Sequence, residues 1–477
     1  MNVTAENSNL KSGLKEQCLN FSEVIGQSIA NIAPSVGPAL GIPMVYASSG
    51  NGTWLTYIFA TFAVLLVGYH INQFAKRSSS PGSLYTYVAD GLGSGAGFLS
   101  GWSLVIAYML TGCATLAGFS NYVNVVGSYF GIKLPAIGIV LVGLLIAGYL
   151  VYKDVSLSAK FMLILEGISL ALIFTLGIIV LSKNGFRPDM TQIKLQGVSF
   201  NSLRLGLVLA FFSFVGFESA TSLGAEAKSP LKNIPKAVII SAIFVGVLFV
   251  VFSYIEVMGF VGSPTKLSES TAPLNYLADH NGVGFMGIII AIGSMVSFWS
   301  CAVACITAAA RILMSMAKDN ILHPSLGETH AKNNTPHVSI GVILIIIFII
   351  PAILLAKGSK EMDIFGWLGT IATLGFLFSY AMILLSVPPF LHRIKELKPK
   401  DVIIAIFSTL ILSIPIIGSV YPLPAYPYSL FPFLFLAWLI LGGSWYAIMN
   451  VYKQGKANKN AGFYTKKQKM SDNREAS

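Results

Sequence analysis

Twelve long apolar runs, separated by short polar stretches, shape the hydrophobic pattern of this 477-residue chain. A helix needs about 20 mostly apolar residues to cross the hydrocarbon core of a bilayer, and each run is close to that length or longer. The pattern predicts an all-α membrane protein with twelve transmembrane helices, of which the third and eighth are long enough to be tilted. The predicted spans cover 22–49, 53–76, 96–130, 134–151, 156–182, 202–227, 235–262, 283–318, 335–356, 362–387, 402–421 and 428–452.

The first run is interrupted near its middle. Pro34 and Pro38 each remove a backbone donor, and Gly37 loosens the chain between them. A single proline often only kinks a membrane helix, but this density of helix breakers predicts that the helix unwinds here.

The sixth run carries a glycine and a carboxylate at mid-membrane depth, Gly216 and Glu218. A charge there costs about 2.5–3.5 kcal/mol or more, so such residues are usually functional. Gly216 also weakens the helix at this point. The alternative is a glutamate hydrogen-bonded inside a helix bundle, with the glycine allowing close packing. Two interrupted helices at corresponding positions of two halves are the best sequence sign of a transporter substrate site.

Composition and charge support a membrane protein. The chain is 55% hydrophobic and 11% charged, whereas soluble domains carry roughly 25% charged residues. Of its 31 Lys and Arg residues, 23 fall on the side of both termini and 8 on the other. This distribution predicts a multi-pass protein of the cytoplasmic (plasma) membrane with both termini in the cytoplasm. It also explains the net charge of +11 without nucleic acid as a partner.

The four cysteines lie in the N-terminal tail or within apolar runs. We therefore expect free thiols, with no metal site and no cofactor. No phosphate-binding loop, nucleophile elbow or His/Asp cluster is present in the sequence, so we expect no catalytic residues and no enzyme.

Three stretches resemble the amino acid–polyamine–organocation (APC) superfamily of secondary transporters. They are Phe214-Val215-Gly216-Phe217-Glu218-Ser219 with Glu226-Ala227-Lys228-Ser229-Pro230; Ser80-Pro81-Gly82-Ser83-Leu84-Tyr85-Thr86-Tyr87 with Gly101-Trp102; and Ala310-Arg311 with Met316-Ala317-Lys318-Asp319-Asn320. The resemblance covers about residues 21–390, and Ala33–Pro38 stands where many members carry a Gly-Ser-Gly-type motif. It implies a LeuT-type inverted repeat of five plus five helices, with two extra C-terminal helices.

The domain organisation follows from the runs and this resemblance. A cytoplasmic tail (1–21) precedes a transporter domain (22–452), and a basic cytoplasmic tail follows (453–477). Repeat one covers about 22–182 and repeat two about 202–387, and the extra helices cover about 402–452.

The two broken helices define the predicted substrate site. The amides and positive helix end around Ser35–Gly37 suit an amino acid's carboxylate, and the carbonyls around 212–215 suit its ammonium. Phe212 is either an aromatic gate or a core residue. The predicted substrate-binding residues are Ala33, Pro34, Ser35, Val36, Gly37, Tyr108, Phe212, Ser213, Val215, Gly216 and Cys305. Weaker candidates, for which ordinary helix packing is the simpler interpretation, are Thr111, Cys301, Phe365 and Trp367.

Two buried carboxylates, Glu218 and Glu166, are the predicted proton-coupling residues. A low-dielectric surrounding favours the neutral form of a carboxyl group, so either residue suits the binding and release of protons. Glu23 and Glu256 lie near predicted span ends, where capping or snorkelling is expected. A sodium site remains open, because Ser294, Ser297, Ser300 and Thr307 provide hydroxyls in the eighth run.

The sequence thus predicts secondary active transport of a neutral or modestly cationic amino acid by alternating access, with proton symport expected. The expected partners are the amino acid, a coupling proton and the lipid bilayer. An exchanger or polyamine permease on the same fold is the first alternative, and a channel is an alternative from another class.

Overall fold

A computed structural model of the chain describes residues 13–153, 155–421 and 424–451. Within these residues the regular secondary structure is helical, and a single isolated bridge pairs Leu19 with Ala227. The main helices are α1 (Phe21–Ile32), α2 (Ile42–Ser49), α3 (Thr53–Ala75), α4 (Leu84–Leu92), α5 (Ser94–Ser128), α6 (Ala136–Lys153), α7 (Val155–Lys183), α8 (Met190–Ile193), α9 (Phe200–Phe212), α10 (Pro230–Gly259), α11 (Pro273–His280), α12 (Gly284–Lys318), α13 (His337–Ala356), α14 (Glu361–Arg393) and α15 (Pro399–Gly418).

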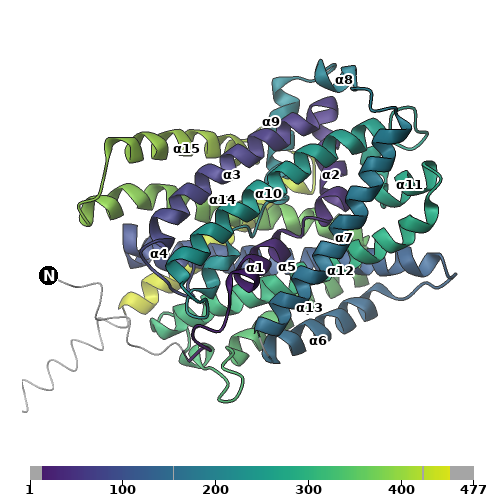
Figure 1. Cartoon of the computed structure of the whole chain (residues 1–477). Helices are drawn as coiled ribbons and strands as arrows, with labels where there is room; N and C mark the ends of the chain where they lie inside the picture. The colour runs from purple at the N-terminus through teal and green to yellow at the C-terminus, as the bar shows by residue number, and fades with distance from the viewer. Residues whose placement is uncertain (1–12, 154, 422–423, 452–477) are drawn as a thin grey trace, which may run out of the picture.

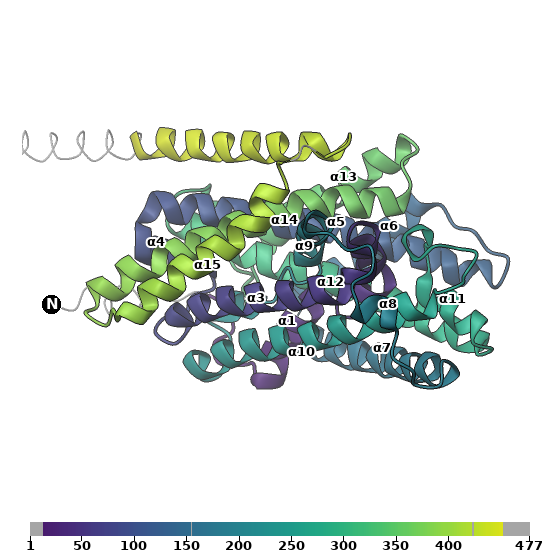
Figure 2. The same cartoon turned by 90° about the horizontal axis from the view of Figure 1, so that it is seen from above.

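Ten stretches of the described residues are long and apolar enough to cross a membrane, so the chain is a multi-pass membrane protein. This count differs from the predicted twelve at two places. The 55-residue stretch Phe21–Ala75 contains α1, α2 and α3. The sixth predicted run is divided into α9 and the 3₁₀ helix η4 (Ser219–Leu223), neither of which is long enough to qualify. The last stretch, Tyr428–Val451, lies at the edge of the bundle (Figure 2).

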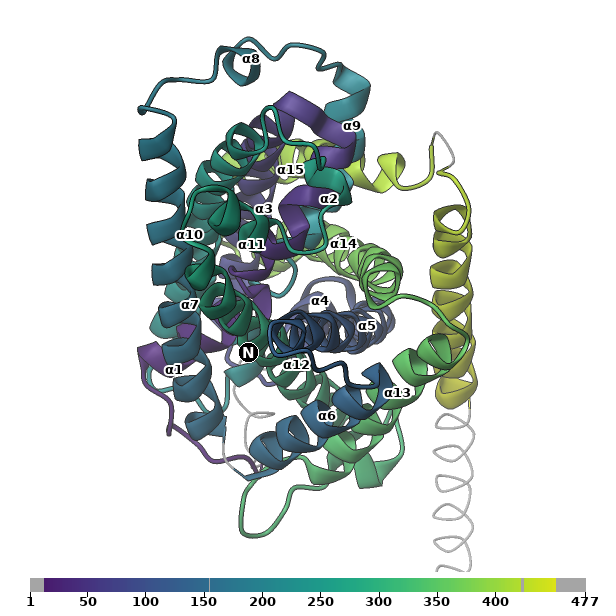
Figure 3. The ribbon, with the colours of Figure 1, turned by 90° about the vertical axis from the view of Figure 1, so that its right-hand side faces the viewer.

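The centre of the bundle is formed by α5 and α12, around which the other helices are arranged (Figure 3). Each has 35 residues, which confirms that the third and eighth spans are long. The broken first span contacts α12, α7 and α10, and α14 packs along α5. Outer helices expose large apolar side chains, such as Leu145 of α6 and Ile345 of α13, as expected where a helix faces lipid.

Short helices lie at both ends of the bundle. α4 is at one end, and α8 and α11 are at the other (Figure 1). α11 folds back over the end of α10, where a Cβ atom at Gly259 would lie 2.6 Å from the side chain of Leu277. The hydropathy pattern gives no sign of these short helices, because none is long enough to span a membrane.

Candidate functional site

The first span is broken where the prolines predict. α1 ends at Ile32, and Ala33 adopts a left-handed conformation with φ 51°. After an irregular turn the chain continues as a π-helix, η2 (Gly37–Gly41), and then as α2. Pro38 lies in the first turn of η2, where its missing N–H has no helical partner to lose.

The sixth span is also broken. α9 ends at Phe212, and Gly216 has φ 88°, a conformation that favours glycine. A Cβ atom at Gly216 would lie 2.0 Å from Oδ1 of Asn31, so the glycine also allows the two breaks to approach closely. These findings confirm the predicted interruptions in both spans.

Side chains of α1 satisfy the backbone groups that the sixth-span break exposes. The Ser28 hydroxyl donates to the carbonyl of Phe217 (2.8 Å) and accepts from the amide of Ala220 (3.1 Å). The Ser219 hydroxyl donates to the carbonyl of Gln27 (3.2 Å). Irregular backbone at membrane depth is stable only when its polar groups find such partners, so α1 stabilises the break in the sixth span.

Glu166 of α7 reaches the break in the first span. One of its carboxyl oxygens accepts a hydrogen bond from the amide of Ser35 at 2.8 Å, and its side chain is 1% exposed. The buried hydroxyls of Ser35 and Ser297 lie beside the same carboxyl group. The amide of Val36 bonds to the carbonyl of Ala33 (2.8 Å). Two of the amides predicted to receive a substrate carboxylate therefore have protein partners in this conformation.

Glu218 connects three elements beside the second break. Tyr108 of α5 donates to one carboxyl oxygen (2.7 Å), and Tyr380 of α14 donates to the other (2.6 Å). All three side chains are buried. Glu218 is therefore a hydrogen-bonded carboxyl group that links α5 and α14 to the broken helix.

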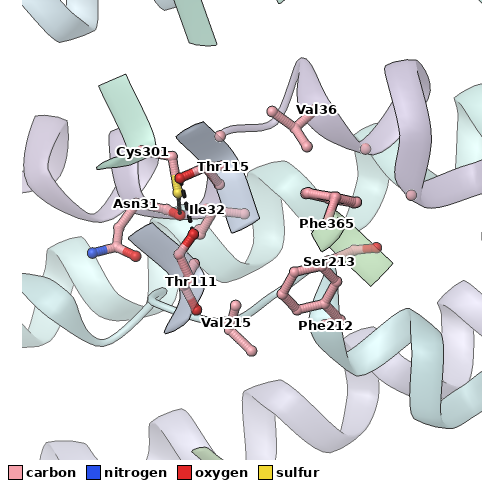
Figure 4. Close-up of a pocket in the computed structure, with 13 residues that line it drawn as sticks. Asn31, Ile32, Val36, Thr111, Thr115, Phe212, Ser213, Val215, Cys301 and Phe365 are labelled. Atoms are coloured by element: carbon pink, nitrogen blue, oxygen red, sulfur yellow. Dashed lines mark hydrogen bonds between the residues drawn. The ribbon is translucent and has the colours of Figure 1, made fainter. Parts of the chain in front are cut away.

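A small cavity of about 30 Å³ lies between the two breaks. This volume accommodates water but no amino acid, so an amino acid could bind here only if the cavity widened. Asn31, Thr111 and Cys301 lie at one end of the cavity, and the rings of Phe212 and Phe365 lie at the other, with centroids 5.4 Å apart (Figure 4). The complete lining is Asn31, Ile32, Ala33, Val36, Gly37, Gly41, Thr111, Thr115, Phe212, Ser213, Val215, Cys301 and Phe365.

The cavity brings together six of the predicted substrate-binding residues: Ala33, Val36, Gly37, Phe212, Ser213 and Val215. Three weaker candidates, Thr111, Cys301 and Phe365, also line it. The remaining predicted residues lie near the cavity but not in its wall: Pro34, Ser35, Tyr108, Gly216 and Cys305. Trp367 packs instead in a separate apolar cluster with Phe431 and Phe435.

Four lining residues are absent from the sequence prediction: Asn31, Ile32, Gly41 and Thr115. Asn31 could have been noticed in the sequence, because it is an amide side chain within an apolar run, three residues before Pro34. Its Oδ1 lies 3.6 Å from the thiol of Cys305, and its amide nitrogen has no partner among the described residues. Thr115 follows Thr111 by one helical turn, so it lies on the same face of α5. It could be predicted to line the cavity only if Thr111 was already taken to do so.

A larger groove of about 630 Å³ lies between α5, α6 and α12. Its walls are apolar, including Phe119, Ile139 and Val142. The one polar side-chain group nearby, the indole N–H of Trp299, already donates to the carbonyl of Gly143 (2.8 Å). The groove therefore offers nothing to hold the charged groups of an amino acid, and the small cavity is the better candidate site.

A buried ion pair joins α12 to the end of the sixth span. Arg311 of α12 binds both carboxyl oxygens of Glu226 at 2.6 and 2.7 Å, and both side chains are 1% exposed. Beside it, the backbone of Leu19 pairs with the segment after η4 through bonds of 3.0 and 2.7 Å. This pair fastens α12, the end of the sixth span and the start of the chain to one another.

The two glutamates predicted near span ends differ. Glu23 caps α1, since its carboxylate accepts the amide of Asn20 at 2.6 Å, which confirms the capping expectation. For Glu256 the expectation of snorkelling or capping is wrong. Its side chain is 0% exposed, on a helix that packs against α1, α3 and η2.

The structure places all four cysteines as free thiols, with Cys113, Cys301 and Cys305 buried. Within the described residues, no group of three or more His, Cys, Asp or Glu side chains is placed to hold a metal ion.

Comparison with known proteins agrees with this architecture. The family model described as amino acid permease matches residues 23–462, which is most of the chain. The chain belongs to the amino acid permease family. A permease is a transporter and not an enzyme, which confirms both the predicted superfamily and the expectation that the chain is no enzyme.

Curated relatives of this permease are distant. A branched-chain amino acid permease of Bacillus subtilis is 26% identical over 311 residues, which cover 61% of this chain and 65% of the relative. A methylthioribose transporter of the same organism is 25% identical over 309 residues (61% and 65%). Cationic amino acid transporter 4 of Mus musculus is 25% identical over 378 residues (73% and 57%). The chain thus matches somewhat less than two thirds of the length of these relatives.

Proposed function

We propose that this permease is a secondary active transporter that carries a neutral amino acid across the plasma membrane by alternating access, coupled to proton symport. It would have twelve transmembrane helices in a LeuT-type fold. Five spans (about 22–182) and five further spans (about 202–387) form inverted repeats, and two spans (about 402–452) follow. Both termini would lie in the cytoplasm, as the excess of Lys and Arg on that side favours.

The observation that carries the proposal is the meeting of the two broken spans at one buried cavity. A helix interrupted at mid-membrane presents backbone donors and acceptors without adding charged side chains. An amino acid needs a place for one carboxylate and one ammonium, and the two breaks can supply both. Corresponding breaks in two repeats favour alternating access over a channel.

The lining of the cavity supports a neutral substrate. Among the described residues, no charged side chain lies in its wall, and Ile32, Val36 and Val215 present apolar groups beside the hydroxyls of Thr111 and Thr115. The charged side chain of a cationic or acidic substrate would have no counter-ion in this wall, and burying an unpaired charge is strongly unfavourable. A polyamine permease is disfavoured for the same reason. Similarity to the branched-chain amino acid permease supports a branched aliphatic substrate.

Proton coupling rests on Glu218 and Glu166. Each lies against one of the two breaks, so each must change its partners when the breaks move. A carboxyl group whose solvation changes during the cycle binds a proton in one state and releases it in another.

Uptake of radiolabelled amino acids into proteoliposomes, with and without an inward proton gradient, tests the proposal. We expect leucine, isoleucine or valine to accumulate only with the gradient. Methylthioribose should be included in the same screen, because one of the relatives is named a methylthioribose transporter. Accumulation driven by sodium alone would refute proton coupling, and uptake of no amino acid would refute the substrate class.

A further inference from the structure

Glu256 is a third buried carboxyl group. The proposed function assigns proton coupling to Glu166 and Glu218 and gives Glu256 no role. It lies on α10, three residues before the helix ends at Gly259. Its side chain is 0% exposed, and neither carboxyl oxygen has a hydrogen-bond partner among the described residues. Glu166 and Glu218, by contrast, accept one and two protein hydrogen bonds respectively.

The surroundings of Glu256 belong to the outer half of the broken first span. Its carboxyl group lies within electrostatic range of the hydroxyls of Tyr57 (α3) and Tyr122 (α5). Tyr122 donates to the carbonyl of Ala39 in η2 (3.3 Å), and Tyr57 bonds to Ser213 at the sixth-span break (3.0 Å). Glu256 therefore lies among the contacts that hold η2 against the rest of the bundle.

No cation of the described residues is buried next to Glu256. Among side chains that the structure describes, α3 adds Tyr69 and His70 near its far end from Tyr57. α7 contributes Glu166 and Lys183, α11 contributes Tyr276, Asp279 and His280, and α2 contributes Tyr46. Lys183 and His280 are exposed. His280 stacks on Tyr276, whose ring lies against Phe260 beyond the end of α10 (centroids 4.8 Å apart). Glu23 of α1 lies at the opposite end of the bundle, and η2 and η4 carry no titratable side chain.

A bare carboxylate is not compatible with this site. A buried charge without a partner is highly unfavourable, and such a group is neutralised instead. The closed conformation therefore requires that Glu256 hold a proton. Opening of the outer half of the first span would admit water, in which an ordinary glutamate is ionised at neutral pH.

We propose that Glu256 is an additional proton-binding site, which takes up a proton from the outer side each time the outer gate closes. The inference rests on the proposed alternating-access cycle and extends it, because it places a proton-binding step at the gate. Because the closed state needs a proton on Glu256, closure of the gate depends on the external pH.

The direction of the pH dependence follows from this requirement. Closure is fully favoured at an external pH below about 4.3, where a solvated glutamate is itself protonated. It is lost progressively as the pH rises, because closing must then extract a proton from water. While the closed state holds one more proton than the open state, the ratio of open to closed molecules rises about tenfold per pH unit.

Cys301 provides a reporter of the open state. It lies in the wall of the central cavity and is 2% exposed, so a reagent from outside reaches it only through an open gate. The experiment uses a background in which the other three cysteines are replaced by alanine. A membrane-impermeant thiol reagent is added from outside, and the rate at which it labels Cys301 is measured between about pH 5 and pH 8. Glu256→Gln is measured in the same background. Dividing one rate by the other cancels the pH dependence of the thiol and of the other carboxyl groups.

We expect the ratio of the wild-type rate to the Gln variant's rate to rise with external pH, by up to about tenfold per unit. Glu269→Gln is the matched control, because Glu269 is an exposed acid in the loop that follows α10, paired with Lys266. It should leave the wild-type profile unchanged. If Glu256→Gln does not fold, Glu256→Leu removes the proton site without a polar group and carries the same expectation. A ratio independent of pH overturns the proposal. Because labelling needs no substrate, this result is separate from the outcome of the uptake screen.

Discussion

Replacing one member of the Arg311–Glu226 pair gives the sharpest test of how the site is closed. In Glu226→Gln, Arg311 remains buried in the closed conformation without a charged partner. Removing one member of a buried ion pair costs about 3–5 kcal/mol. The two bonds of 2.6 and 2.7 Å and the 1% exposure of both side chains place this pair in that range. The Gln carbonyl and the existing bond from Arg311 to the carbonyl of Thr307 (3.0 Å) retain part of the stabilisation, so we expect the lower end.

This loss applies to the closed conformation only. In the proposed alternating-access cycle this end of the bundle opens to the cytoplasm, and water then solvates Arg311 in the variant and in the wild type alike. About 3 kcal/mol therefore shifts the equilibrium towards the inward-open state by roughly a hundredfold, since each 1.4 kcal/mol is a factor of ten. Labelling of Cys301 by an impermeant thiol reagent from the cytoplasmic side measures that shift.

The exposed pair Arg77–Glu396 provides the control. Its side chains are 31% and 55% exposed, and such pairs contribute about 0–1 kcal/mol, so Glu396→Gln should change labelling by less than about fivefold. The double variant Glu226→Gln/Arg311→Met should restore most of the closed population, because replacing a whole buried pair is often neutral. Unchanged cytoplasmic labelling in Glu226→Gln, with a folded protein, would refute the role of the pair in closure.

Three further variants and competitors test the site. Glu218→Gln should permit exchange of substrate down its own gradient but abolish accumulation driven by a set pH gradient in proteoliposomes. Glu166→Gln should shift the pH dependence of accumulation, with partial loss. Gly37→Leu should abolish substrate binding in a calorimetric or scintillation assay, because a Cβ atom at this position would lie 2.1 Å from the ring of Phe249. Gly341→Leu is the control and should bind substrate normally, because a Cβ atom there would meet no other atom within 4 Å. Excess glutamate or aspartate should not compete with uptake, and neutral amino acids should.

The helix breaks could be predicted from the sequence because their causes are local. Proline and glycine act on their own turn of helix wherever they stand, so the interruptions at Pro34 and Gly216 required no knowledge of the fold. The apolar runs were likewise readable, since each span must satisfy its own backbone in lipid.

The partners of the buried charges could not be predicted. Arg311 pairs with a residue 85 positions away, and Tyr380 meets Glu218 across 162 positions. Nothing in the local sequence specifies either contact. Glu256 was misjudged for a related reason. Its depth was inferred from the nearest end of the span, but its side chain is 0% exposed on a helix that packs against α1 and α3, which are distant in sequence.

The bond between Glu166 and Ser35 gives the proposed coupling of substrate and proton a physical basis. The amide of Ser35 is one of those predicted to receive the substrate's carboxylate, yet here it donates to a carboxyl group of the protein. One N–H cannot serve two carboxylates, and two like charges side by side in a dry site repel each other strongly. Substrate binding next to Ser35 therefore requires Glu166 to be protonated or to move away. Coupling between binding events is reciprocal, so a proton on Glu166 should strengthen substrate binding and bound substrate should strengthen proton binding. Wild-type affinity should therefore fall as the pH rises, and Glu166→Gln, which carries no charge, should bind substrate with an affinity that no longer depends on this group. An unchanged pH dependence of the dissociation constant in Glu166→Gln would show that the carboxylate of the substrate binds elsewhere.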